Sequence, residues 1–183
     1  VVGDYKTDRP GPRGVEGLIA HYSPQLSAYR EGLRAVLPGS RPRAELWLIG
    51  DGERAWQLCD LAAAQGVADR VVFWGPRSDV PELLGRMDVF AFSTTRDEGF
   101  GIALIEAMAA GLACVAADTR FHRDVLAHRR TGILYRTPAE ALDGVARLID
   151  SPAMRSSLGS AARQEASSRF DTAKFGARLE RAY

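Results

Sequence analysis

Short apolar runs alternate with segments of helical apolar spacing along most of this chain. The runs, such as ELWLIG, VVFWG and ACVAA, lie at residues 15–22, 45–50, 71–75, 88–93, 113–117 and 132–135. Residues 28–37 and 54–66 are examples of the helical segments between them. Strands that are apolar on both faces and separated by helices indicate a parallel sheet with helices covering both sides. The sequence therefore predicts an α/β fold, a doubly wound, mainly parallel Rossmann-like sheet.

The first residues differ in composition from the rest. Residues 1–14 contain two prolines, three glycines and several charges, which predicts an exposed linker. The Rossmann-like domain is expected over residues 15–169. Thr137 and Ser151 are each followed by proline, so they predict the N-caps of two helices beyond the last strand.

Composition excludes several classes of partner. Lys and Arg total 24 against 23 Asp and Glu, a net charge of +1, so neither nucleic acid nor an acidic membrane is expected as a partner. No apolar run approaches the length of a membrane span and no signal peptide is present, which favours a cytoplasmic location. Cys59 and Cys114 lie in apolar segments and predict buried free thiols. The histidines and cysteines show no metal-ligand spacing, so no metal site is expected.

The segment STTRDEGFGIALIEAMAAG, residues 93–111, carries the strongest signal for a site. It follows a predicted strand, and ligands bind beyond the carboxyl ends of the strands in open parallel sheets. Gly99 and Gly101 flank Phe100, so a tight turn can bring the first N–H groups of a helix to a phosphate. Glu106 lies among apolar residues of that helix, where a carboxylate needs a hydrogen-bonding partner. The two hydroxyls of a ribose would serve.

Two structural explanations compete with that interpretation. Glu106 could pair with Arg96 or Arg120, and Glu98 could be an ordinary loop carboxylate beside Asp97. The spacing of the two glutamates does not decide between a structural role and ligand binding.

EGFGIALIEAMAAG resembles the E-x7-E motif of retaining GT-B glycosyltransferases of family 4. The similarity continues through AELWLIGDGE, DRVVFWGPRSDVPELLGRMDVFAFS and RTGILY, and it covers the chain from about Gly17 onward. The resemblance implies the C-terminal, nucleotide-sugar-binding half of a two-domain enzyme that needs no further cofactor. The N-terminal GT-B domain is then missing from this chain, residues 170–183 form a closing helix that crosses back to it, and the full protein can contact a membrane peripherally.

The resemblance also assigns roles to particular residues. Glu98 contacts the donor sugar as the catalytic residue, and Glu106 binds the ribose diol. The backbone of Arg77 pairs with the nucleobase. The backbone from Gly99 through Phe100 and Gly101 to Ile102 faces the sugar and the diphosphate. No protein nucleophile is implied, because the leaving phosphate oxygen can accept the proton of the acceptor.

This sequence departs from the family pattern in two places. The family's Arg and Lys near the end of the first strand are absent from residues 17–27, where His21 is either a substitute or a structural residue. A glycine pair is replaced at residues 118–124, where Arg120, His122 or Arg123 either supplies positive charge or belongs to a solvated turn. In GDGE, Gly52 is either close to a ligand or part of a plain strand-to-helix turn.

The sequence thus predicts glycosyl transfer from a nucleotide sugar to an unknown acceptor. A catalytically degenerate module of the same origin, which only binds a nucleotide or a partner, is the alternative. A nucleotide-sugar epimerase of similar architecture fits the motifs less well. Release of nucleoside diphosphate or formation of a glycoside separates the enzyme from the module.

Overall fold

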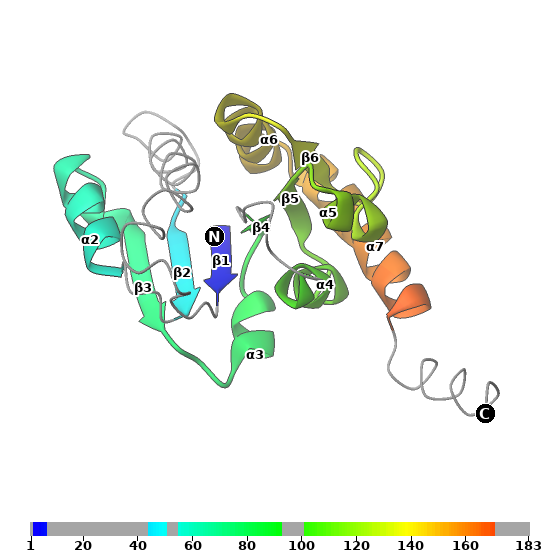
Figure 1. The fold of residues 1–183 in the computed structure, drawn as a ribbon, viewed down its shortest axis with the longest axis horizontal. Coiled ribbons are helices and arrows are strands. Elements are labelled where there is room, and N and C mark those ends of the chain that lie inside the picture. The colour runs from blue at the N-terminus through cyan, green and yellow to red at the C-terminus, as the bar shows by residue number, and fades with distance from the viewer. Residues whose placement is uncertain (1, 7–43, 51–54, 93–100, 171–183) are drawn as a thin grey trace.

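In the computed structural model, residues 2–6, 44–50, 55–92 and 101–170 are described. They form a six-stranded sheet with the order β3-β2-β1-β4-β5-β6, and every pair of neighbours is parallel (Figure 1). The strands are β1 Val2–Lys6, β2 Leu46–Gly50, β3 Val71–Gly75, β4 Val89–Phe92, β5 Ala113–Ala117 and β6 Ile133–Tyr135. The predicted doubly wound parallel sheet is confirmed.

The first strand is not where the sequence predicted it. Val2–Lys6 is a central strand, paired on one side with β2 and on the other with β4, so the prediction of a linker over residues 1–14 is wrong at this point. Parallel ladders on both sides supply the hydrogen bonds that hold a strand with few apolar residues. The first strand therefore ends at Lys6 and not within residues 17–27, where the family's Arg and Lys were expected. Residues 7–43, which include the predicted strand at 15–22, lie outside the described residues.

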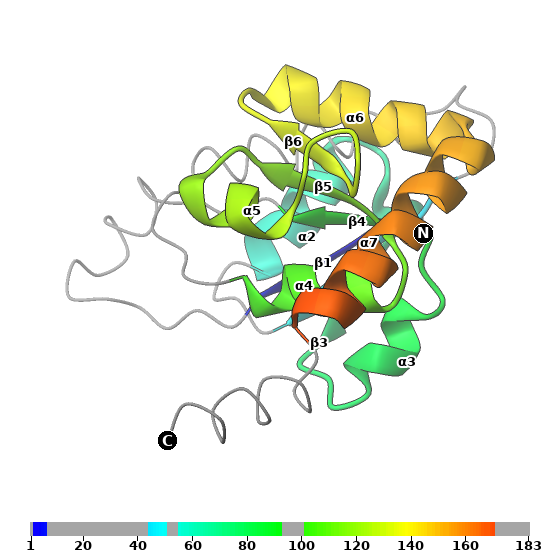
Figure 2. The same ribbon diagram turned by 90° about the vertical axis from the view of Figure 1, so that its right-hand side faces the viewer.

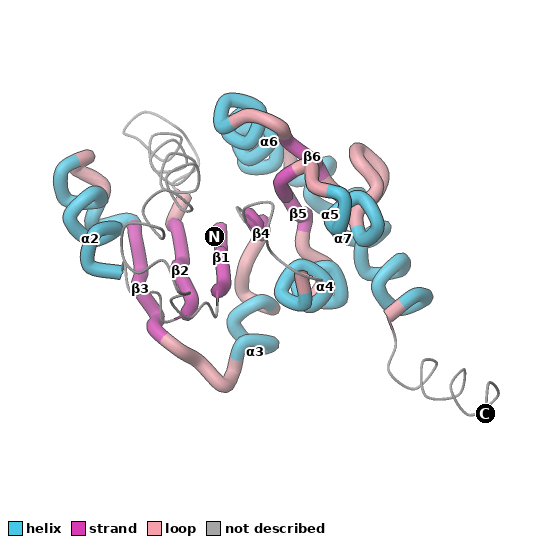
Figure 3. Tube along the Cα trace, viewed as in Figure 1, coloured by secondary structure: helices cyan, strands magenta, loops and turns pink. Residues whose placement is uncertain are grey.

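Helices cover both faces of the sheet, as Figure 3 shows with α3 and α4 below the strands and α6 above them. One core lies beneath α3, α4, α5 and the second half of α7, and it includes Leu83, Leu104, Val125 and Ala162. A second core lies beneath α2 and α6 and includes Ala62 and Leu148. The helices are α2 Ala55–Ala64, α3 Val80–Leu84, α4 Ile102–Ala109, α5 Arg120–Val125, α6 Pro138–Asp150 and α7 Pro152–Arg169.

The two predicted helix starts after the sheet are confirmed. The Thr137 hydroxyl accepts from the Glu140 N–H at 3.2 Å, and the Ser151 hydroxyl accepts from the Met154 N–H at the same distance. The prediction of two buried cysteines is half right. Cys114 is buried in β5, whereas Cys59 is exposed on α2, because α2 buries only one side against the sheet. No helix among the described residues is long and apolar enough to cross a membrane.

Candidate nucleotide-sugar site

The carboxyl ends of β4 and β5 bring the candidate site together. The two strands are parallel neighbours, so the chain leaves both of them at the same edge of the sheet, and α4 and α5 begin there (Figure 2). This edge is where open parallel sheets bind their ligands. Lys6, the last residue of β1, lies at the same edge, because β1 pairs in parallel with β4.

The predicted glycine turn is present at Gly101, the N-cap of α4. Its backbone is left-handed, with φ of 68° and ψ of 50°, and no side chain among the described residues caps the helix. The Gly101 carbonyl accepts from the N–H groups of Leu104 at 2.9 Å and Ile105 at 3.2 Å. The N–H groups of Ile102 and Ala103 have no acceptor among the described residues. These two donors and the helix dipole favour an anion at this end of α4.

Glu106 lies in the second turn of α4, and its side chain is exposed. The helix buries Leu104, Ala107 and Met108, so its opposite side carries Glu106 and Ile102, which is 68% exposed. The prediction that apolar residues enclose this carboxylate is therefore wrong. The helix is apolar on nearly all sides, so its composition did not reveal which side packs against the protein. Among the described residues the Glu106 carboxylate has no ion pair or hydrogen bond, so the pairing with Arg120 is not formed.

Arg77 follows β3 on the loop that leads to α3. Its guanidinium donates two hydrogen bonds to the Asp79 carboxylate, at 2.7 and 2.6 Å, and lies 5.5 Å from the centre of the Trp74 ring. The hydrogen bonds from Arg77 hold the pKa of Asp79 below its usual value. The backbone N–H and C=O of Arg77 have no partner among the described residues, so both can pair with a ligand while the side chain stays anchored.

The basic residues after β5 have three different environments. Arg120 is exposed and has no partner among the described residues. His122 is 1% exposed; its Nδ1–H donates to the Ala117 carbonyl at 2.7 Å, and its ring meets the Phe92 ring edge-on at 5.2 Å. Arg123 pairs with Asp118. Of these three residues, only Arg120 has a side chain that is both exposed and unpaired among the described residues. His122 points into the core from the first turn of α5, and Arg123 is paired with Asp118.

Several candidates from the sequence lie outside the described residues. They are Glu98, Gly99, Phe100, His21 and Gly52. Sequence reasoning in turn did not place Lys6 at this edge, because residues 1–14 were predicted to be a linker. The described residues contain no cluster of His, Cys, Asp and Glu that could hold a metal ion.

The parallel Rossmann-like sheet has the architecture of one half of a GT-B fold, and its likeness to solved glycosyltransferase structures supports this fold. The chain belongs to the family of glycosyl transferases group 1, whose profile matches residues 25–165.

Three similar proteins show the extent of the likeness. The chain is 32% identical over 172 residues to the GDP-mannose-dependent alpha-(1-6)-phosphatidylinositol monomannoside mannosyltransferase of Mycobacterium tuberculosis, covering 87% of this chain and 44% of that protein. It is 29% identical over 142 residues to the N-acetyl-alpha-D-glucosaminyl L-malate synthase of Bacillus anthracis, covering 76% and 37%. The structure of Anabaena HepE in complex with UDP-glucose superposes with a TM-score of 0.73 at 26% identity, covering 99% of this chain and 47% of that one. The chain thus spans less than half the length of each relative.

Proposed function

We propose that this chain is the donor-binding half of a retaining glycosyltransferase that uses a nucleotide-diphosphate sugar. The open carboxylate of Glu106 carries the proposal. It lies one turn beyond the uncapped start of α4, where a ribose diol can donate to both of its oxygens. Membership of the group 1 family and the nucleotide-sugar ligands named for two of the relatives support the same function.

Each part of the donor has a candidate partner at the edge of the sheet. The N–H groups of Ile102 and Ala103 would bind the diphosphate, and the backbone of Arg77 would pair with the base. Arg120, which begins α5 at this edge, is a cation that could neutralise the diphosphate, and Lys6 ends a strand at the same edge. The sequence resemblance assigns the sugar to Glu98 and to the backbone of residues 99–102.

In the proposed reaction the bond from the anomeric carbon to the diphosphate oxygen breaks. A bond from that carbon to an acceptor hydroxyl forms on the same face. The leaving phosphate oxygen accepts the hydroxyl proton, so no protein base is required. Stabilising the charge that develops on the diphosphate is then the main contribution of this half. The acceptor would lie on a second, N-terminal half, since the chain spans less than half the length of its relatives.

Isothermal titration calorimetry with UDP, GDP and their sugar derivatives tests the donor site. At least one nucleotide is expected to bind, and Glu106→Ala is expected to weaken it by about 1–3 kcal/mol, the effect of losing a charged hydrogen-bond partner. Asp60→Ala, which removes an exposed carboxylate on α2, is the matched control and should leave the affinity unchanged. If no nucleotide binds at millimolar concentration, or if Glu106→Ala binds as tightly as the parent, the donor site is wrongly assigned.

Turnover separates the enzyme from the degenerate module. The chain joined to its N-terminal half should release nucleoside diphosphate in step with glycoside formation. Nucleotide binding without any release of diphosphate would instead support the binding module.

A further inference from the structure

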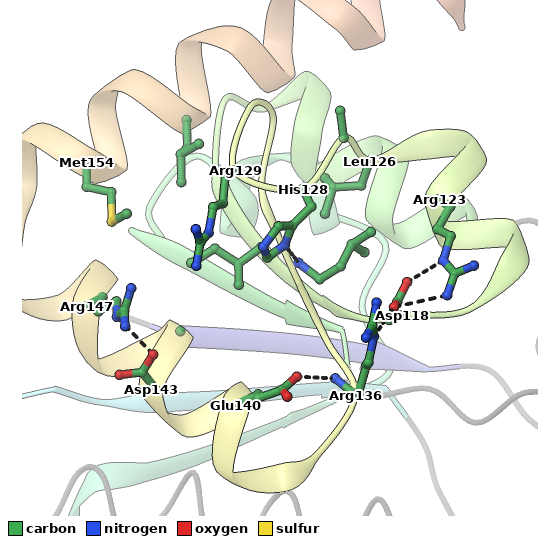
Figure 4. Close-up of a pocket in the computed structure, with 15 residues that line it drawn as sticks. Asp118, Arg123, Leu126, His128, Arg129, Arg136, Glu140, Asp143, Arg147 and Met154 are labelled. Carbon is green, nitrogen blue, oxygen red and sulfur yellow. Dashed lines mark hydrogen bonds and ion pairs between the residues drawn. The ribbon is translucent and has the colours of Figure 1, made fainter.

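A second pocket, of about 680 Å³, lies at the β6 end of the sheet (Figure 4). It is enclosed by β6, α6, the start of α7 and the loop that leads into β6. None of the described residues assigned to the donor site lines it. Its volume falls within the range of about 300–1,000 Å³ that is usual for small-molecule sites. The pocket has apolar walls, formed by Leu126, Ala127, Ile133, Leu134, Met154 and Leu158, and a charged rim.

The rim carries one more arginine than carboxylates. Its charged residues are Arg123, Arg129, Arg136 and Arg147 with Asp118, Glu140 and Asp143. The Asp118 carboxylate accepts hydrogen bonds from Arg123 and, at 2.8 Å, from Nε of Arg136. Nε of Arg147 lies 2.9 Å from the Asp143 carboxylate. Arg136 and Arg147 are therefore held through Nε, and their terminal amino groups make no hydrogen bond among the described residues.

Arg129 differs from the other rim arginines in two respects. Its guanidinium has no partner among the described residues, and in Figure 4 it points from the loop toward α6. It is also the only residue other than glycine with positive φ, 60°, in the described parts of the chain. A side chain in this conformation costs about 1–2 kcal/mol that a glycine would not. An unfavourable backbone conformation that persists points to a role for the side chain it carries.

We propose that this pocket binds a small organic anion, with Arg129 donating to its oxyanion group and with Arg136 and Arg147 adding positive charge at opposite sides of the rim. The planar guanidinium matches phosphate and carboxylate oxygens alike, so the ligand is either a phosphate ester or a compact polycarboxylate. The apolar walls bind its carbon body. The unfavourable backbone conformation of Arg129 is the cost of placing over the pocket a guanidinium that is unpaired among the described residues.

Thermal shift and calorimetry with glucose 6-phosphate, citrate and glucose test the proposal and separate the two ligand classes. One of the two anions is expected to raise Tm by about 3–6 °C at roughly ten times its Kd, and glucose is expected to have no effect. Arg129→Gly is the decisive variant. It should raise the Tm of the ligand-free protein, because the strain is removed, and weaken anion binding at least about tenfold, as expected for a lost charge-assisted hydrogen bond.

Arg130→Gln is the matched control, since it removes the same charge one residue along the chain. Arg130 does not line the pocket and lies 3.6 Å from the Glu165 carboxylate. Arg130→Gln should bind the anion with the same affinity as the parent protein. The titrations are repeated with Gly101→Ala, which disturbs the turn that carries the proposed phosphate donors of the donor site. This variant should also bind the anion as tightly as the parent, so failure of the donor site leaves this result unaffected.

Three outcomes would overturn the proposal. Neither anion raises Tm at millimolar concentration, or Arg129→Gly binds the anion as tightly as the parent. Loss of anion binding in Gly101→Ala would show that the anion occupies the donor site instead.

Discussion

Gly159 of α7 lies against the backbone of Gly111 so closely that a Cβ on Gly159 would overlap the Gly111 carbonyl oxygen. Gly111 follows the end of α4, so this contact sets how closely the helix that carries Glu106 packs against α7. Gly159→Ala is expected to lower the free energy of unfolding by about 1–3 kcal/mol, as for other insertions into packed interiors. Urea unfolding measures it, with the exposed Ser160→Ala as control. Equal stability of the two variants would contradict the close approach.

Gly101 and Gly66 allow the turn at α4 to be tested with a matched pair. Both have positive φ, 68° and 66°, but a Cβ at Gly101 would lie 3.4 Å from Cε1 of Phe92, whereas one at Gly66 meets nothing within 4 Å. Gly101→Ala and Gly66→Ala should each lose about 1–2 kcal/mol of stability. Only Gly101→Ala should also weaken nucleotide binding in calorimetry, because only that turn presents donors to the ligand. Unchanged nucleotide affinity in Gly101→Ala would count against the turn as part of the site.

Asp118 predicts a pH dependence of stability. Hydrogen bonds from Arg123 and Arg136 hold the pKa of Asp118 well below its usual value. The folded state therefore binds this proton less readily than the unfolded state, and the contribution to stability is complete above about pH 5 and is lost as the pH falls below about 4. Asp118→Asn should be less stable than the parent by about 1 kcal/mol at pH 7, since water around the two arginines screens the pairs. Urea unfolding from pH 7 to pH 2 should show the two proteins converge, and a constant difference would be the contrary result.

The two glutamates of the motif are expected to act on different steps. In a protein that includes the N-terminal half, Glu98→Gln should lower kcat strongly and leave the Kd for nucleoside diphosphate nearly unchanged, because the proposed assignment has Glu98 contact the sugar alone. Glu106→Gln should raise that Kd. Steady-state kinetics and calorimetry on the same preparations measure both effects. Equal effects of the two variants on diphosphate affinity would refute this division.

The 183-residue chain alone is expected to bind donor without transferring its sugar. Without a second half the acceptor is not positioned and water stays at the anomeric carbon, so the advantage of a closed site is absent. Transfer should appear when a separately expressed N-terminal half is added. Efficient transfer by the chain alone would mean that the acceptor site lies within these residues.

The apolar runs between helical segments were enough to predict five of the six strands, because strands buried on both faces must be apolar throughout. The N-caps Thr137 and Ser151 could also be predicted from the sequence, because a helix N-cap depends on a few adjacent residues. The glycine turn at the start of α4 was predicted for the same local reason. The sequence by itself thus determined the class of fold, the family resemblance and the position of the glycine turn before α4.

Tertiary structure decided what depends on partners distant in the chain. Val2–Lys6 is a strand because β2 and β4 bond to it from both sides, and its own composition gave no such signal. Packing of α4 against the sheet and α7, which buries one side of the helix, left Glu106 exposed and open to a ligand. The anion pocket likewise joins Arg129 and Arg147 from separate elements. Local patterns specify which elements form, whereas burial and charge pairing depend on which of their faces meet.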